Sequence, residues 1–180
     1  MKKSRFLNRF FVVLTTACVM FSFSSCSDDD DDDTTGVKGT YTGSVYIGSS
    51  TTPKSITAKV DDSNITLKSF PVSDLISQYM GDAAASIIAS LSPINYAIPY
   101  TATATSTGYA LTLKPDTLPI TVPTGLTTSM TVKVVVAGQS ATYTESTKNL
   151  AFNITATQVI VGGVAMPTFS PTAFRVSLTK

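Results

Sequence analysis

Apolar and polar residues alternate along most of the chain beyond residue 36. In one such segment Tyr41, Val45 and Ile47 occupy one face, while Thr40 and Thr42 occupy the other. A period of two is typical of a β-strand with one buried and one solvated face, so the pattern predicts an antiparallel sheet. We expect about ten strands, at approximate ranges 40–47, 56–60, 65–70, 96–104, 109–113, 118–122, 130–136, 141–143, 150–156 and 174–178.

Short stretches of turn-forming residues separate these strands. The runs 61–64 and 114–116 predict tight turns, the run 137–140 predicts a connection between two strands, and the pair Gly162-Gly163 predicts a hairpin turn. No Pro/Gly-rich linker interrupts the chain after residue 36. The sequence therefore predicts a single, mainly β domain over residues 37–180, built as an antiparallel β-barrel or a β-sandwich.

The segment near residues 74–91 has a different period. Its apolar residues recur at a spacing of three to four, which is typical of an amphipathic α-helix. They are Leu75, Ile76, Tyr79, Met80, Ala83, Ala84, Ile87, Ile88 and Leu91. We expect one helix inserted in the sheet, where it completes the core. A lid over a ligand cavity or a partner-binding helix is the alternative.

The first 25 residues have the layout of a signal peptide. Residues 1–9 include four basic side chains, and residues 10–23 form an apolar run of 14. A helix needs about 20 residues to cross a bilayer core of ~30 Å, so this run is too short to be a membrane span. It predicts a secretory signal rather than part of the fold.

The sequence Phe23-Ser24-Ser25-Cys26 resembles a bacterial lipobox, in which one large apolar and two small residues precede the cysteine that receives the lipid. The resemblance implies a signal peptide over residues 1–25, lipidation at Cys26 and attachment to the membrane through that lipid. Cys18 is a weaker candidate because it lies inside the apolar run. With Cys18 removed and Cys26 modified, the domain has no thiol and must rest on its hydrophobic core.

Ser27 and six consecutive aspartates follow Cys26. Physically this run is a solvated, self-repelling spacer, so residues 26–36 are assigned as lipidated cysteine and acidic linker. Cys-Ser-Asp at this place also resembles the export signal of Bacteroidota-type surface lipoproteins. The resemblance implies an outer-membrane lipoprotein exposed at the cell surface, with its export signal at Ser27, Asp28, Asp29 and Asp30.

The first predicted strand opens with Gly39-Thr40-Tyr41-Thr42-Gly43, which resembles the Gly-x-Tyr-x-Gly strand of calycin-like (lipocalin-like) domains. The chain as a whole is similar to uncharacterised lipoprotein domain families of gut Bacteroidota. The resemblance implies a small barrel that holds a single ligand. It carries over no catalytic residues.

Composition excludes several kinds of chemistry. The chain has no histidine, which excludes an imidazole base, a Ser-His triad and a His-rich zinc site. Outside residues 1–9 and 28–33 there are nine basic and six acidic side chains. Their scattered charge of +3 is not a nucleic-acid footprint, so we expect no nucleic-acid partner.

The six acidic side chains of the domain do not predict a catalytic pair. Most fall in predicted turns or at the start of the predicted helix, whereas a glycosidase needs two carboxylates across a cleft. No Gly-x-Ser-x-Gly elbow and no glycine-rich phosphate loop occurs. We therefore expect no enzymatic activity, no metal and no cofactor. The six acids are Asp61, Asp62, Asp74, Asp82, Asp116 and Glu145.

Two features remain as binding candidates. Tyr46 lies on the polar face of its predicted strand, and residues 159–171 form either an exposed apolar loop or one packed under a neighbouring turn. Neither assigns ligand-binding residues. We expect a non-enzymatic surface lipoprotein whose β domain binds a small molecule, a glycan or a protein. A structural or accessory subunit of a cell-envelope assembly is the alternative.

Overall fold

The computed structural model of the chain describes residues 36–80, 85–123 and 129–180. The predicted signal peptide over residues 1–25, the predicted lipidation site Cys26 and the predicted export signal at Ser27 and Asp28–Asp30 lie outside the described residues. The described residues all belong to one compact unit. Among the described residues, no helix is long and apolar enough to cross a membrane.

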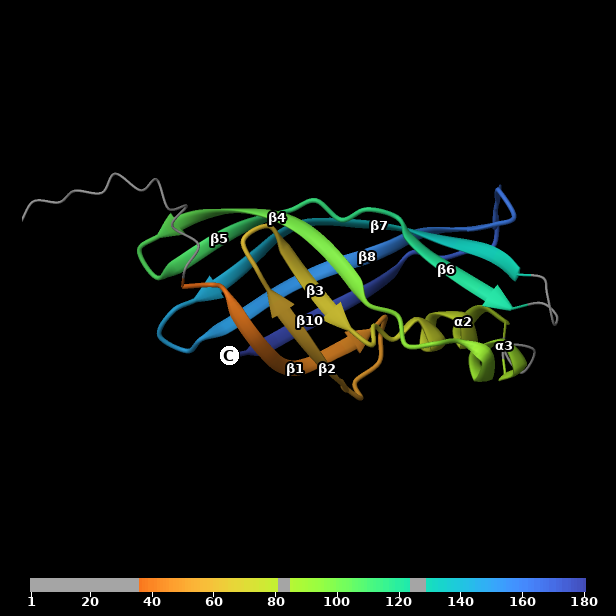
Figure 1. The fold of residues 1–180 in the computed structure, drawn as a ribbon, viewed down its shortest axis with the longest axis horizontal. Helices are drawn as coiled ribbons and strands as arrows, with labels where there is room; N and C mark the ends of the chain where they lie inside the picture. Colours follow the sequence, from red (N-terminus) through yellow and green to blue (C-terminus); the bar gives the residue numbers. More distant parts are fainter. Residues whose placement is uncertain (1–35, 81–84, 124–128) are drawn as a thin grey trace, which may run out of the picture. The chain divides into compact units, whose positions relative to one another are not determined.

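Within the described ranges the chain forms ten strands and two helices (Figure 1). The strands are β1 (Gly39–Ile47), β2 (Lys54–Val60), β3 (Asn64–Lys68), β4 (Tyr96–Thr105), β5 (Gly108–Leu113), β6 (Leu118–Pro123), β7 (Ser129–Thr144), β8 (Asn149–Val161), β9 (Val164–Ala165) and β10 (Thr172–Thr179). The helices are α2 (Val72–Met80) and α3 (Ala85–Ser90).

Eight of the strands close into an antiparallel barrel. Their order is β7-β5-β4-β3-β2-β1-β10-β8, and the pairing of β8 with β7 completes the ring. The mainly β prediction is confirmed, and the choice between barrel and sandwich is settled in favour of the barrel. All these pairings lie within residues 39–179, so the barrel holds within itself every strand contact that it needs to fold.

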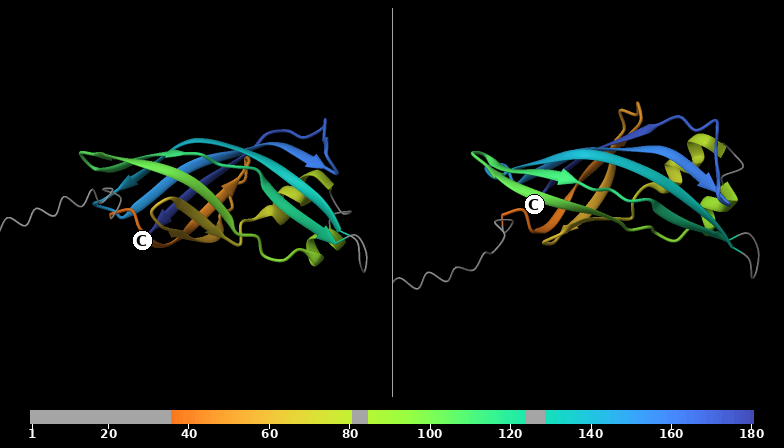
Figure 2. Two further views of the ribbon diagram at one scale, coloured as in Figure 1. Left: turned by 45° about the horizontal axis from the view of Figure 1, so that its top comes forward. Right: turned by 90° about the horizontal axis from the view of Figure 1, so that it is seen from above.

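The long strands β7 and β8 continue beyond the closed barrel. There β6 pairs with the first half of β7, and the short strand β9 pairs with the end of β8. The result is a four-stranded extension with the order β6-β7-β8-β9. Both helices lie at this end of the domain in every view (Figure 2), and α3 contacts β6.

The run 137–140 is not a connection between two strands, as the sequence predicted, but part of the continuous strand β7. Before this run the buried side chains stand at even-numbered positions, the last of them Val136, and after it they stand at odd-numbered positions, the first of them Ala141. A β-bulge between Gly138 and Ala141 makes this change within one strand. The predicted number of strands is still correct because β9, which the pattern did not predict, replaces the strand lost.

The helical region is confirmed, but it forms two short helices rather than one. The first, α2, ends at Met80 and the second, α3, begins at Ala85. The sequence between them starts with Gly81-Asp82, two residue types with low helix propensity. Both ends of the insertion meet at its base, where the N–H of Phe70 donates to the carbonyl oxygen of Ile94 at 2.7 Å.

Aromatic side chains fill the interior of the barrel. Tyr41 and Tyr143 are fully or almost fully buried and meet edge to face. Phe70, at the base of the helical insertion, packs against Tyr96 and Phe174 with ring centroids 5.6 and 4.9 Å apart. Such packing supplies much of the apolar burial that a domain without disulfides needs.

The glycine at the end of the Gly39–Gly43 motif has a clear structural cause. A Cβ atom at Gly43 would lie 2.1 Å from the carbonyl oxygen of Ser177 on β10. Only glycine lets the backbones of β1 and β10 approach so closely at this point. The motif therefore helps close the barrel between its first and last strands.

Candidate functional site: an apolar pocket beside the barrel

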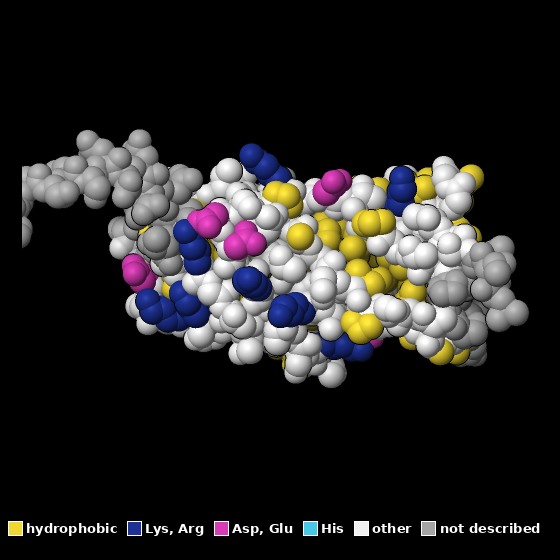
Figure 3. Space-filling view, in the orientation of Figure 1, with side chains coloured by type: hydrophobic (Ala, Val, Ile, Leu, Met, Phe, Trp, Pro, Cys, Tyr) yellow, Lys and Arg dark blue, Asp and Glu magenta, His cyan; other side chains and the backbone are white. Residues whose placement is uncertain are grey.

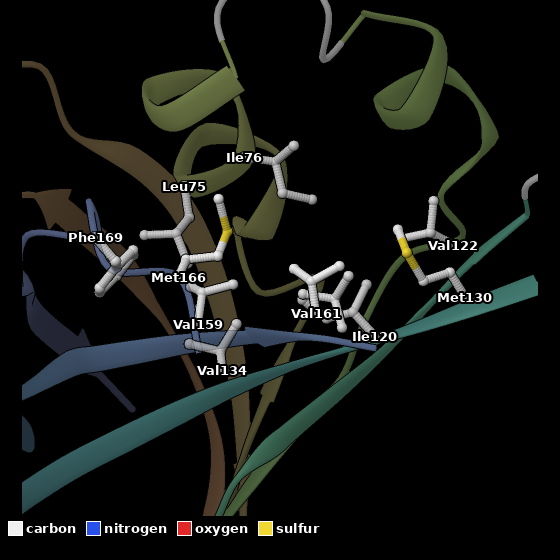
Figure 4. A pocket seen from close by; sticks show the side chains of 11 residues that line it. Leu75, Ile76, Ile120, Val122, Met130, Val134, Val159, Val161, Met166 and Phe169 are labelled. Carbon is white, nitrogen blue, oxygen red and sulfur yellow. The ribbon is translucent and has the colours of Figure 1, made fainter. Parts of the chain in front are cut away.

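A pocket lies between helix α2 and the four-stranded extension of the sheet (Figure 4). Its volume is about 220 Å³. Five parts of the chain line it: α2, the strands β6, β7 and β8, and the loop after β9. The lining side chains are Leu75, Ile76, Ile120, Val122, Met130, Val132, Val134, Val159, Val161, Met166 and Phe169.

Strand alternation explains why the sheet side of the pocket is apolar. On β7, Met130, Val132 and Val134 occupy alternate positions, so all three side chains point to the same face. Their pairing partners continue the apolar surface: Val134 pairs with Val159, and Val132 with Val161. Beyond the β7 bulge the odd-numbered residues Ala141 and Tyr143 face the barrel interior instead. The bulge thus keeps one side of β7 buried along its length, and the buried residues before and after it belong to one hydrophobic core.

The loop after β9 covers one end of the pocket. The N–H of Met166 donates to the carbonyl oxygen of Val159 at 2.9 Å, which folds the loop back over β8. Met166 and Phe169 are half-buried and point into the pocket (Figure 4), whereas Val164 is 72% exposed. The prediction of a loop over residues 159–171 is therefore only partly correct, because residues 159–161 end β8 and Val164–Ala165 form β9. In the rest of the segment Met166 and Phe169 are packed against the core.

Helix α2 forms the opposite wall of the pocket. Leu75 is buried, and Ile76 is partly buried beside it. An ion pair between Asp74, in the first turn of the helix, and Lys54 of β2 holds α2 to the barrel. At the base of the insertion the N–H of Ser69 also donates to the side-chain oxygen of Asn95 at 3.2 Å. The helix therefore both completes the core and covers the pocket.

No polar side chain lines the pocket among the residues that the structure describes. Five of the lining side chains are only partly buried, so apolar surface is open to water at this site. They are Ile76, Met130, Val161, Met166 and Phe169. Figure 3 shows the wider distribution: hydrophobic side chains gather on the half of this face that leads to α2, and most charged side chains lie on the other half.

The acidic side chains are dispersed and make local interactions. Asp61 accepts hydrogen bonds from the backbone N–H groups of Ser63 (3.0 Å) and Asn64 (2.8 Å) in the β2–β3 turn, and these bonds lower its pKa. Asp62 pairs with Lys38. Within the described ranges, no group of three or more carboxylates or cysteines is placed to hold a metal ion.

Tyr41, Tyr96 and Tyr100 are buried, and their hydroxyl groups donate to backbone carbonyl oxygens, that of Tyr41 to Val37. Tyr100 donates to Asp61 at 2.7 Å, and Tyr96 donates to Asp116 at 2.7 Å. Burial raises the pKa of Tyr100 to about 12, and it raises the pKa values of Tyr41 and Tyr96 further. These hydroxyls hold turns against the barrel and stay protonated near neutral pH.

Tyr46, the predicted surface aromatic, faces outward from β1. The guanidinium of Arg175 lies over its ring, 5.3 Å from the ring centroid, and also donates to the carbonyl oxygen of Ser50. The ring is therefore occupied by a side chain of the same molecule. Sequence reasoning found the helix and the 159–171 loop separately but did not bring them together, because only the fold places them against the same strands.

Comparison with known proteins identifies a family for this chain but gives no information about a ligand or a reaction. A comparison with curated proteins and one with solved structures each found no match. The family model described as "Domain of unknown function (DUF4840)" matches residues 36–161. This match covers β1 to β8 and both described helices, and so all of the pocket except Met166 and Phe169. The chain belongs to the DUF4840 family.

Proposed function

We propose that this protein is a non-enzymatic lipoprotein of the outer membrane, anchored through Cys26, whose β domain binds an apolar small molecule at the cell surface. The observation that carries the binding function is the pocket beside the barrel, about 220 Å³ in volume, whose described lining consists of apolar side chains. A dry cavity of about 150 Å³ with such a lining accepts a molecule the size of benzene. The pocket is therefore large enough for a ligand.

Partial exposure of the lining supports a binding role. If this apolar surface served only as core, we would expect the fold to bury it completely, because each square ångström of apolar surface removed from water stabilises the fold by about 25 cal/mol. Met130 and Met166 are both partly exposed here. Methionine side chains are flexible and adapt their shape to what they contact. A ligand would remove this surface from water.

The proposed absence of catalysis rests on the site's own chemistry. A reaction needs a nucleophile, an acid or base, or a bound electrophile beside the substrate, and the described lining of the pocket offers only hydrocarbon groups and two thioethers. The described acids lie in turns or ion pairs elsewhere. Binding without chemical change fits this arrangement.

The proposed anchor rests on the sequence of residues 1–33. Gly36, the first described residue, lies beside Tyr109 and accepts a hydrogen bond from Lys180. The C-terminus lies toward the end of the domain opposite α2 (Figure 1). A domain tethered at this end would present its pocket away from the membrane. We expect Cys26→Ala to release the protein from the membrane fraction. Retention of that variant in the membrane would contradict the anchor.

A calycin-like classification is part of the proposal. It is supported by the eight-stranded antiparallel barrel and by the Gly39–Gly43 motif at its first strand. The proposed ligand site differs from the one that the resemblance implies. Aromatic rings fill the barrel around Tyr41, Phe70 and Tyr143, so the pocket beside the barrel is the better candidate.

A tryptophan reporter tests binding directly, because the chain contains no tryptophan. Met130→Trp places an indole in the lining, and Thr131→Trp places one on the opposite, exposed face of β7. An apolar contact quencher such as a brominated alkane should quench the first reporter and leave the second less affected, because bromine quenches an indole only at short range. Equal quenching of both reporters, or none, would contradict a binding pocket here.

The alternative role, as an accessory subunit of an envelope assembly, would be favoured by a long unpaired edge strand. Within the described chain the two edges of the sheet are β6 and β9. β9 has two residues, and β6 carries prolines at positions 119 and 123. Short edges and edge prolines are features that prevent pairing between sheets. The structure thus offers no specific support for assembly through an edge.

A further inference from the structure

The chemistry of the lining restricts what can occupy the pocket. A peptide or a sugar brings N–H, C=O or hydroxyl groups, and each such group loses its hydrogen bonds to water when it is buried. The described side chains of the pocket offer no oxygen or nitrogen to replace those bonds. The part of the ligand that enters must therefore be hydrocarbon.

The shape of the pocket restricts the ligand further. Three pairs of facing residues follow one another along the sheet: Val134 with Val159, Val132 with Val161, and Met130 with Val122. Successive pairs are two residues apart, so the apolar floor extends from Met130 to Val134, which is four residue-to-residue steps along β7, or roughly 13 Å. In Figure 4 Phe169 lies near one end of this floor, and Met130 lies at the other. The site is longer than a compact ring system needs.

From this lining and shape we propose that the ligand is a single unbranched hydrocarbon chain, such as the acyl chain of a fatty acid, lying along β7 and β8 under α2. The inference rests on the proposed binding function of the pocket and names its ligand class. A cavity of about 150 Å³ accepts the six carbons of benzene. At the same packing, the 220 Å³ of this pocket accept roughly nine carbons, and a polar head group would remain outside.

The chain comes from outside the protein rather than from its own lipid anchor. Tyr109, beside Gly36, pairs with Tyr143 on β7, whereas the pocket begins at Val134. These two positions on β7 are separated by nine residues, or roughly 30 Å. A lipid on Cys26 that stayed in the membrane would be held at the opposite end of the domain from the pocket.

Binding of a series of fatty acids tests the ligand class. The domain over residues 32–180 is titrated with the polyene probe cis-parinaric acid, which saturated fatty acids of increasing length then displace. Each added methylene should tighten binding about fourfold until the pocket is filled near nine carbons, after which affinity should level off. Fatty alcohols of equal length should bind within about twofold of the acids, since no charged side chain lines the site.

Two variants locate the binding. Val134→Phe fills one end of the floor and should weaken binding at least tenfold or shift the plateau to shorter chains, whereas Thr131→Phe on the opposite face of β7 should leave binding unchanged. The fold of each variant is checked by circular dichroism. If Val134→Phe fails to fold, Met130→Phe, at a partly exposed position, takes its place.

The results distinguish the two proposals. If compact apolar molecules quench Met130→Trp but affinity does not grow with chain length, the acyl-chain inference is wrong and the binding function stands. If neither chains nor compact molecules bind, both proposals fail. Equal loss of binding in Thr131→Phe and Val134→Phe would place the site elsewhere and overturn the inference.

Discussion

The rings of Tyr41 and Tyr143 meet edge to face in the barrel interior, with centroids 6.3 Å apart and planes at 83°. Their hydroxyl groups are not equivalent. Tyr41 donates to the carbonyl oxygen of Val37, four residues before it, and so ties the start of the domain to β1. The hydroxyl of Tyr143 is buried and has no described partner at hydrogen-bonding geometry, although Tyr143 lies close enough to Tyr41 to help raise the pKa of that phenol, after the larger effect of burial.

This difference predicts that replacing tyrosine by phenylalanine changes the free energy of unfolding differently at the two positions. Tyr143→Phe removes a buried polar group without a partner, so the free energy of unfolding should stay within about 0.5 kcal/mol or rise. Tyr41→Phe leaves the Val37 carbonyl without its donor and should cost about 1–3 kcal/mol. Urea denaturation followed by circular dichroism measures both values. A loss above ~1 kcal/mol in Tyr143→Phe would mean that an internal water molecule binds this hydroxyl.

Buried tyrosines also predict how stability depends on pH. A free tyrosine has a pKa of about 10, and burial raises that of Tyr100 to about 12. Between these values the unfolded chain has released the proton and the folded chain has kept it. Stability is therefore full below about pH 10 and falls as the pH rises toward 12.

Urea midpoints between pH 8 and pH 11.5 measure this fall. Lysines titrate in the same range, so Tyr100→Phe is the control that isolates one residue. Below pH 9 the wild type should be more stable than Tyr100→Phe, because the Tyr100 hydroxyl donates to Asp61. That difference should shrink above pH 10. A constant difference across the range would contradict the raised pKa.

The pattern of residues predicted the strands better than their arrangement. Alternation at Ile56, Ala58 and Val60 is a local property, and the structure buries these three residues as expected. Closure of the barrel depends on contacts such as Val45 with Val176, which are far apart in the chain and have no local pattern. A parity change such as that between Val136 and Ala141 fits a turn or a bulge equally well, and only the neighbouring strands decide between them.

The pocket was not predictable for a related reason. Its lining comes from five separate segments, and each one taken alone has an ordinary structural explanation. Met130, Val132 and Val134 look like the buried face of any strand. Only the extension of β7 and β8 beyond the ring leaves this face without a closed barrel around it, so that α2 and the loop at Met166 become its cover.

A glycine pair tests how the barrel closes. Gly43→Ala would place a methyl group 2.1 Å from the Ser177 carbonyl oxygen, and the backbones must then move apart. We expect a cost of roughly 3 kcal/mol, at the upper end for an overpacked site. Gly162→Ala is the control. The φ of Gly162 is +57°, but a Cβ atom added there would meet no atom within 4 Å other than those of its chain neighbours. We therefore expect only backbone strain of about 1–2 kcal/mol in this variant. Similar costs for the two variants would argue against the close approach of β1 and β10.

The prolines of β6 predict the behaviour of the sheet edge. Proline has no N–H group, so position 119 offers no donor to a strand laid against the edge. Pro119→Thr restores the donor, and an exposed edge strand with its donors intact is a template for pairing with another chain. We expect this variant to form dimers or larger species at concentrations where the wild type sediments as a single species. Analytical ultracentrifugation measures the difference.

Pro99→Thr is the matched control for the edge prediction. Pro99 is exposed on β4, and β4 already has β3 and β5 as neighbours. A donor restored there adds nothing to a free edge, so the sedimentation of Pro99→Thr should match that of the wild type. If both proline variants associate equally, the cause is a general loss of stability rather than an opened edge. If neither associates, the shortness of β6 and its contact with α3 are enough to protect it.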